Sequence, residues 1–263
     1  MEVHHHPQLN HSKKKWSEYL LEFFMLFLAV FLGFLAESIR EKSVEKTREK
    51  DYMKEVVENL KYDSIRCTLN KERNIELNLG LDSLRAEIKN ALAGKVNANA
   101  LYYYSIKYAG NSNHAVFNRS AITELKNSGS LRLIQNKQLV RELANYYERK
   151  ISAAEDEYPT NSQKDYLSQQ QNEIFSLRDL DDLIASFDDV SDKNYVNQFN
   201  FLSLLTHTPP LQLLKNDPLE WEKYYALVGS WEISLKNYNF WLTYCKNAAM
   251  KLVGDIQKEY HLK

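Results

Sequence analysis

The sequence predicts an all-α protein, with one N-terminal transmembrane helix followed by a domain built as a bundle of long helices. Three observations favour this fold class. Residues 23–36 form an unbroken apolar run, FFMLFLAVFLGFLA. The 263-residue chain holds seven glycines and five prolines, which is few for a fold rich in strands and turns. Residues 221–256 repeat apolar side chains at the three-four spacing of a helix.

The bulk composition excludes several classes of protein. The 34 basic and 35 acidic residues leave a formal net charge of −1, so no overall field attracts nucleic acid, and we expect no nucleic-acid partner. Two cysteines are too few for a disulfide scaffold or for a four-cysteine zinc site.

The apolar run is the predicted membrane anchor. Together with the flanking residues from Tyr19 onward it approaches the roughly 20 residues that cross a bilayer. A run without a polar face suits lipid better than the core of a soluble domain, and its continuation through Glu37 without a cleavage site argues against a cleaved signal peptide. We therefore divide the chain into a short polar tail (1–18), a transmembrane helix (19–39) and a helical extramembrane domain (40–263). The residues expected to form the membrane anchor are Trp16, Tyr19, Phe23, Gly33 and Ala36.

Orientation follows from the charges on either side of the anchor. Lys13, Lys14 and Lys15 precede the span, and five basic residues between Arg40 and Lys50 follow it, so the count alone favours a cytoplasmic C-terminal domain. The basic residues after the span, however, alternate with acidic ones. Because long domains cross membranes largely regardless of their charge, the leading lysines carry more weight. We expect a cytoplasmic N-terminus and a periplasmic C-terminal domain, in a single-pass protein of a bacterial inner membrane.

Beyond the anchor, the apolar spacing predicts several helices. Residues 37–92 contain no proline and form one long helix, or two with a break near Asn70 or Gly80. Its buried face is expected to include Met53, Val56, Leu60, Ser64 and Cys67. Further helices are expected over 101–108, over 120–147 as two helices joined at 128–130, and over 163–175, and the acidic segment 178–193 is expected to be a loop.

Parts of this pattern resemble a known family. The stretch from Glu124 to Tyr147, the anchor segment EFFMLFLAVFLGFLAESIRE and the opening HHHP at His4 to Pro7 are similar to an uncharacterised Bacteroidetes family of membrane-anchored proteins that carries a domain of unknown function. The resemblance covers nearly the whole chain. It implies a short cytoplasmic tail, one span and a helical domain, and it implies no activity.

The last helix has the clearest start signal in the chain. Asp217 is an expected N-cap, Pro218 occupies the first helical position, and Glu220 lies in capping-box register. The apolar stripe that follows, called the helix seam here, includes Trp221, Tyr224, Val228, Trp231, Leu235, Tyr238 and Leu242 and continues through Cys245 to Ile256. A stripe of this length needs partner helices, so we expect an antiparallel bundle within the chain, with a parallel dimer as the alternative.

The sequence shows no pattern of a catalytic or metal site. The histidines of the tail are neighbours in sequence, and His114 and His207 lack a second ligand at helical spacing. The acidic stretch 179–192 lacks the glycine and the alternation of a calcium loop. No phosphate-binding loop, nucleophile elbow or CxxC pair occurs. We expect no enzyme activity and no cofactor.

The two cysteines lie on apolar stripes of different helices. If the stripes around Cys67 and Cys245 face each other, the sulfurs could be close enough to form a bridge in an oxidising compartment. The alternative is that each cysteine is a small buried apolar residue.

These features favour a membrane-anchored helical interaction or scaffold protein. Its expected partners are the lipid bilayer and either another protein or a second copy of the chain. The alternative function is a membrane-tethered helical bundle that senses a small ligand, which requires a pocket.

Overall fold

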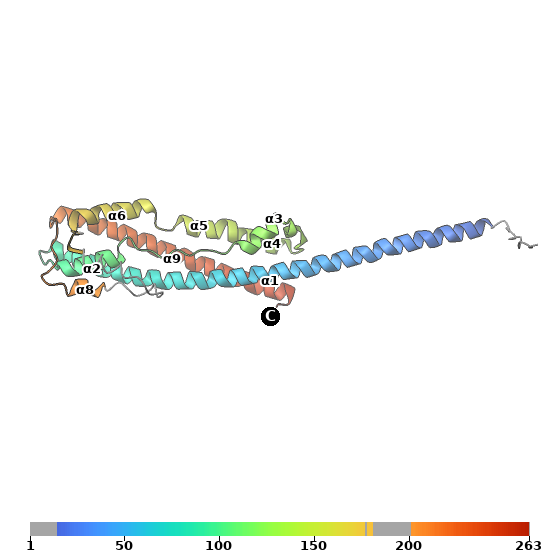
Figure 1. Ribbon diagram of the computed structural model, residues 1–263, viewed down its shortest axis with the longest axis horizontal. Helices are drawn as coiled ribbons and strands as arrows, with labels where there is room; N and C mark the ends of the chain where they lie inside the picture. Colours follow the sequence, from blue (N-terminus) through green and yellow to red (C-terminus); the bar gives the residue numbers. More distant parts are fainter. Residues whose placement is uncertain (1–14, 177, 181–200, 263) are drawn as a thin grey trace, which may run out of the picture. The chain divides into compact units, whose positions relative to one another are not determined.

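The computed structural model describes residues 15–176, 178–180 and 201–262, and within these ranges the chain is helical, with loops between the helices and no strand (Figure 1). The predicted all-α class is confirmed. The α-helices are α1 Trp16–Leu92, α2 Ala98–Tyr108, α3 Ser120–Asn127, α4 Lys137–Asn145, α5 Ile151–Asp156, α6 Asn161–Ile174, α8 Leu202–Leu205 and α9 Pro218–Tyr260. Shorter turns are the 3-10 segments η1 Ser130–Leu133 and η3 Arg178–Leu180 and the π-helix η2 Tyr146–Lys150. The chain divides into two compact units, Met1–Tyr52 and Met53–Lys263, with the boundary inside α1.

The first unit contains the predicted apolar helix. The side chains of residues 23–36 are exposed apart from Leu28, which is half-buried. The ring of Phe27 lies 6.5 Å from that of Phe23 and 6.2 Å from that of Phe31, centroid to centroid. One 18-residue window of α1 near the N-terminus is long and apolar enough to cross a membrane, and none of it is buried within the chain. The protein therefore has a long N-terminal helix whose apolar side chains are exposed among the residues that the structure describes.

In the second unit, α1 continues without interruption past both positions at which a break was considered. At Asn70 the side-chain amide bonds back to the carbonyl of Arg66, at 2.8 Å, within the helix. At Gly80 the missing side chain makes room for a ring from α2, because a Cβ there would lie 2.2 Å from two ring carbons of Tyr108. Gly80 is thus a point of close approach between two helices and not a hinge.

We expect Gly80→Ala to lower the free energy of unfolding. The added methyl group overlaps a largely buried ring, and over-packing of this kind costs about 1–3 kcal/mol, more than the roughly 1 kcal/mol that alanine gains over glycine in a helix. Gly254→Ala in α9 is the matched control, since nothing lies within 4 Å of its Cβ position, and it should leave stability unchanged or raised. Thermal unfolding of both variants, followed by circular dichroism in detergent, tests the difference. Equal melting temperatures would contradict the close approach.

The start of α9 agrees with the sequence signals in two of three respects. The carboxylate of Asp217 accepts a hydrogen bond from the backbone N–H of Leu219 at 2.7 Å, and Pro218 is the first helical residue. The carboxylate of Glu220 accepts a bond from the side-chain amide of Gln170 in α6, at 2.7 Å, and pairs with Lys223 at 3.0 Å. The expected capping glutamate therefore serves to join α9 to α6.

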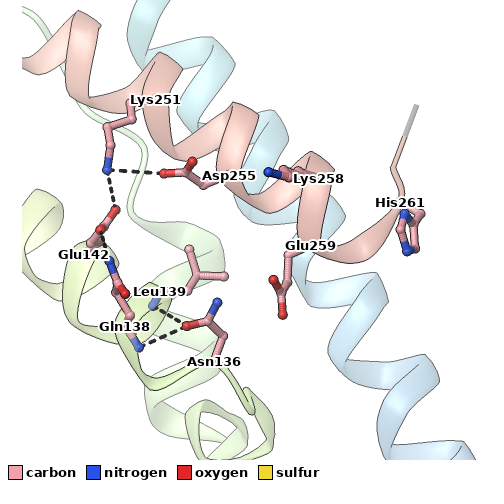
Figure 2. A pocket seen from close by; sticks show the side chains of 9 residues that line it. All are labelled: Asn136, Gln138, Leu139, Glu142, Lys251, Asp255, Lys258, Glu259 and His261. Atoms are coloured by element: carbon pink, nitrogen blue, oxygen red, sulfur yellow. Dashed lines mark hydrogen bonds and ion pairs between the residues drawn. The ribbon is translucent and has the colours of Figure 1, made fainter.

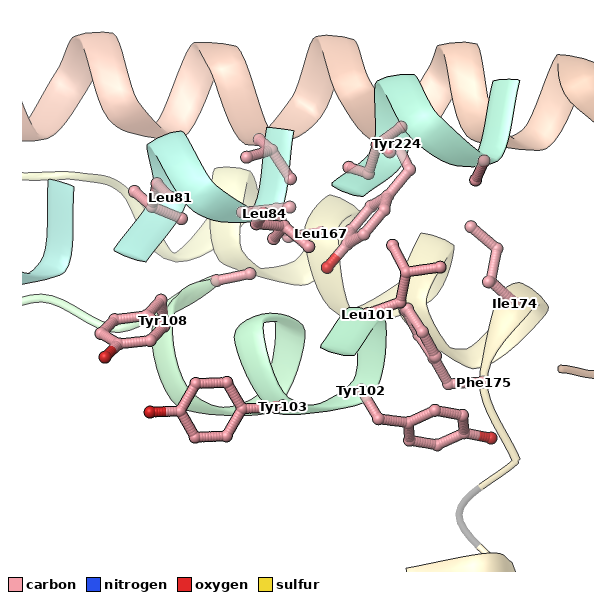
Figure 3. Close-up of a cluster of buried hydrophobic side chains, with 14 of the residues drawn as sticks. Leu81, Leu84, Leu101, Tyr102, Tyr103, Tyr108, Leu167, Ile174, Phe175 and Tyr224 are labelled. Atoms are coloured by element: carbon pink, nitrogen blue, oxygen red, sulfur yellow. The ribbon is translucent and has the colours of Figure 1, made fainter. Parts of the chain in front are cut away.

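A cluster of buried apolar side chains from α1, α2, α6 and α9 forms the core of the second unit (Figure 3). Tyr102 lies edge-on to Phe175, with 4.8 Å between ring centroids, and its hydroxyl donates to the carbonyl of Gln212 at 2.7 Å and accepts from the backbone N–H of Ser176 at 2.6 Å. The tyrosines therefore supply apolar area and also satisfy buried backbone groups. Other members of the cluster are Leu81, Leu84, Leu101, Leu167, Ile174 and Tyr224.

Within the second unit, α1 and α9 run in opposite directions. Arg85, late in α1, donates to Glu232 at 3.0 Å and to the hydroxyl of Tyr225 at 2.7 Å, both early in α9. Cys67, earlier in α1, has Cys245 of late α9 among the groups that raise its pKa. Helices α6, α5 and α4 follow one another along α9 (Figure 1). All three helices contact α9.

Candidate functional site

The helix seam of α9 lies entirely inside the second unit. All seven predicted residues from Trp221 to Leu242 are buried, with exposed fractions of 1% or less. The indole of Trp231 donates to the carbonyl of Asn111 at 3.1 Å, and the hydroxyl of Tyr238 accepts from the backbone N–H of Ala115 at 2.9 Å. The seam therefore packs the core and positions the loop between α2 and α3, and it is not available to an outside partner.

A buried carboxylate that the sequence analysis did not single out lies at the middle of α1. Asp63 is fully buried. It accepts hydrogen bonds from the backbone N–H of Asn118 at 2.7 Å and from the hydroxyl of Tyr146 at 2.9 Å. Burial raises the pKa of this carboxyl to about 6, because two neutral donors do not fully replace the water that stabilises the charge.

Buried asparagines on the same face of α1 hold the loop 109–119. The amide of Asn74 accepts from the backbone N–H of Asn113 at 2.8 Å and donates to its carbonyl at 3.1 Å. One turn from Asp63, Asn59 accepts from the side chain of Asn118 at 2.9 Å and donates to Ser120 at 3.0 Å. These polar groups bond to one another and to the backbone, so their evident role is to fix the loop.

The two cysteines lie near this carboxylate and are free and buried. Burial raises the pKa of the Cys67 thiol far above its usual value, with a further contribution from Cys245. Burial also raises the pKa of Cys245 to about 12, and its thiol donates to the carbonyl of Lys150 in the π-helix at 3.4 Å. Cys245 lies near enough to Cys67 to raise the pKa of its thiol, but both cysteines are free, and buried thiols with raised pKa values are poor nucleophiles.

A pocket of about 560 Å³ lies between the start of α4 and the end of α9 (Figure 2). Lys251 spans it, with its amine 2.9 Å from the carboxylate of Glu142 and 3.3 Å from that of Asp255. The side chain of Asn136 caps α4 by accepting from the N–H groups of Gln138 and Leu139, each at 3.1 Å. The remaining lining residues are Lys258, Glu259 and His261. The lining holds three carboxylates, two lysines and one histidine, and Gln138, Glu142, Lys251 and Asp255 bond to one another.

The described part of the chain contains no group of three or more histidine, cysteine, aspartate or glutamate side chains placed to hold a metal ion. His114 packs between the rings of Tyr158 and Tyr238, at centroid distances of 4.6 and 6.4 Å, and the ring of His207 bonds to the carbonyl of Pro209 at 2.8 Å. The tail histidines and most of the acidic stretch 179–192 lie outside the described residues.

The predicted anchor residues all belong to α1. Trp16, Tyr19, Phe23, Gly33 and Ala36 are exposed, and nothing lies within 4 Å of the Cβ position of Gly33. Large apolar side chains are also exposed in the second unit, among them Ile65 and Leu79 on α1 and Ile233 and Phe240 on α9.

No family model, curated protein or solved structure matches the chain. The similarity to the Bacteroidetes family of membrane-anchored proteins stays a prediction from sequence.

Proposed function

We propose that the protein is a membrane-anchored interaction or scaffold protein, in which the N-terminal part of α1 spans the bilayer and a helical bundle binds another protein or a second copy of the chain. The observation that carries the proposal is the apolar window of α1, none of which is buried by the described residues. Apolar surface of that extent is unfavourable in water and favourable in lipid.

The binding half of the proposal rests on how the second unit uses its polar groups. Asp63, Asn59 and Asn74 make hydrogen bonds within the unit, and the two cysteines are free and buried. Large apolar side chains such as Ile233 and Phe240 are nevertheless exposed. A helical unit that uses its buried polar groups to hold its own loops, and that exposes large apolar side chains, suits recognition of another helix better than catalysis.

A single observation favours the alternative, a bundle that senses a small ligand. The pocket between α4 and α9 has the volume of a ligand site. Its lining is polar and internally paired through Glu142, Lys251 and Asp255, whereas ligand pockets are mostly apolar, so we rank sensing second. The proposed location is a bacterial inner membrane, with the tail cytoplasmic and the helical unit periplasmic.

We expect the chain to stay in the membrane pellet after washes with high salt and alkaline carbonate. A double variant, Phe27→Arg with Phe31→Arg, should shift to the soluble fraction, because each charge at the centre of a span costs about 2.5–3.5 kcal/mol. Ile65→Arg with Leu69→Arg is the matched control, since these residues are also exposed and four apart on α1 but lie outside the apolar run. Extraction of the unaltered chain by carbonate would refute the anchor.

The binding half is tested separately. Cross-linking of the chain in native membranes, followed by mass spectrometry of the purified adducts, should show a reproducible protein partner or a self-adduct. The absence of both, with the anchor intact, would refute a scaffold role.

A further inference from the structure

Loop 109–119 is attached to the helices beneath it by their side chains. Between residues 112 and 118 the backbone makes no hydrogen bond to another backbone group of the described chain. Three of its backbone N–H groups bond instead to side chains of α1 and α9. They belong to Asn113, Ala115 and Asn118 and donate to Asn74, Tyr238 and Asp63, at 2.8, 2.9 and 2.7 Å respectively. A segment attached in this way can open while the helices beneath it stay intact.

Of the three side chains that accept from the loop backbone, Asp63 is the one whose charge changes near neutral pH. The amide of Asn74 does not titrate, and burial raises the pKa of the Tyr238 hydroxyl above its usual value, so both groups stay neutral. Burial raises the pKa of Asp63 to about 6. The bond from the N–H of Asn118 is therefore the pH-dependent attachment of the loop.

The groups that surround Asp63 leave its charge only partly compensated. The titratable groups that interact with it are Arg119 of the loop, Tyr146 and Tyr147 of η2, Cys67 of α1 and Cys245 of α9. Arg119 is the cation among them, and its guanidinium also pairs with Glu155 at 2.8 Å. The two hydroxyls and the two thiols stay neutral, because burial raises their pKa values. An ionised Asp63 therefore gains stabilisation from water when the loop opens.

We propose that loop 109–119 is a pH-dependent cover over Asp63, which stays closed while this carboxyl is protonated and opens more readily once it is ionised. The direction follows from burial, because the closed loop holds the carboxyl away from water and so binds its proton more tightly than the open loop does. Opening would uncover Ala115 and Phe117, which are buried in the closed loop. This device goes beyond the interaction function proposed above and does not depend on it.

Hydrogen–deuterium exchange of the full chain in detergent, corrected for the intrinsic pH dependence of amide exchange, tests the proposal. The open population of loop 109–119 should rise by up to roughly 100-fold between pH 4 and pH 7, since the pKa of Asp63 is about 6 when the loop is closed and near 3.8 when water surrounds the carboxyl. Amides in the middle of α9 should stay more strongly protected at every pH. Loop amides whose corrected exchange is independent of pH, or is as slow as that of the middle of α9, would overturn the proposal.

Three variants assign the response to Asp63. Asp63→Asn should remove the pH dependence of loop exchange, because the asparagine oxygen still accepts from Asn118 but does not ionise. Glu148→Gln is the matched control and should keep the native response, since this carboxylate also lies in contact range of η2 but is exposed and pairs with Lys126. Tyr146→Phe removes a donor to the carboxylate, which raises the pKa of Asp63 further and moves the midpoint of the response to higher pH, even if Asp63→Asn fails to fold. A native response in Asp63→Asn, its loss in Glu148→Gln, or an unmoved midpoint in Tyr146→Phe contradicts the proposal.

Discussion

Replacing Trp231 with alanine is expected to lower the free energy of unfolding by about 3–5 kcal/mol, the usual range for removing a buried tryptophan. The side chain is 1% exposed in the middle of the helix seam, and its indole N–H bonds to the carbonyl of Asn111 at 3.1 Å. The variant therefore loses the packing of the ring and also leaves a loop carbonyl without its partner. Unfolding by denaturant in detergent, followed by far-ultraviolet circular dichroism of the helices, measures the loss of stability.

Two further variants separate the loss of ring packing from the loss of the indole hydrogen bond. Trp231→Phe keeps most of the buried area and removes the donor, so it should lose about 1–3 kcal/mol. Leu219→Ala, on the same helix at a position 62% exposed, should change stability by less than about 0.5 kcal/mol. If Trp231→Ala lowered the free energy of unfolding no more than Leu219→Ala does, the result would contradict the burial of the helix seam.

The seam was predictable because burial of a helix face leaves a periodic signal in the sequence. Residues from Trp221 to Leu242 recur at three-four spacing, and the Asp217–Pro218 start places the first turn. The apolar run at 23–36 was equally visible, because its length and uniformity need no partner to be recognised. Both signals lie within a single stretch of sequence, so they can be recognised without knowing any long-range contact, and together they predict the all-α class.

The buried polar centre was not predictable in the same way. Asp63 lies next to Ser64, which was placed on the buried face, and both are buried. From sequence alone, a charged residue at this position of a helix is expected to be exposed, unless its hydrogen-bond donors are known. The donors to Asp63 belong to the loop 109–119 and to η2, which are far away in sequence. The pocket lined by Asn136 and His261 depends on the same kind of long-range contact. One sequence-level hint existed, since Asp63 continues the spacing between Leu60 and Cys67.

We expect Asp63 to make the protein less stable as pH rises from about 4 to about 6. Its folded-state pKa is raised by burial to about 6, above the value near 3.8 expected when the chain is unfolded. Between these values the folded state binds more protons than the unfolded state, so the stability present below pH 4 is lost as pH rises through 6. The total loss is about 2–3 kcal/mol, since each pKa unit corresponds to about 1.4 kcal/mol.

Asp63→Asn isolates this contribution from the other carboxylates, several of which, such as Glu142 and Glu148, have pKa values lowered by lysine partners and so act in the opposite direction. The asparagine oxygen can still accept from the N–H of Asn118, and its amide can donate to the hydroxyl oxygen of Tyr146. The stability of the variant relative to the native chain should therefore rise by about 2–3 kcal/mol between pH 4 and pH 7. Melting temperatures of both proteins at several pH values in this range measure the difference. A difference that stays constant with pH would mean that Asp63 is ionised in the folded protein at its ordinary pKa.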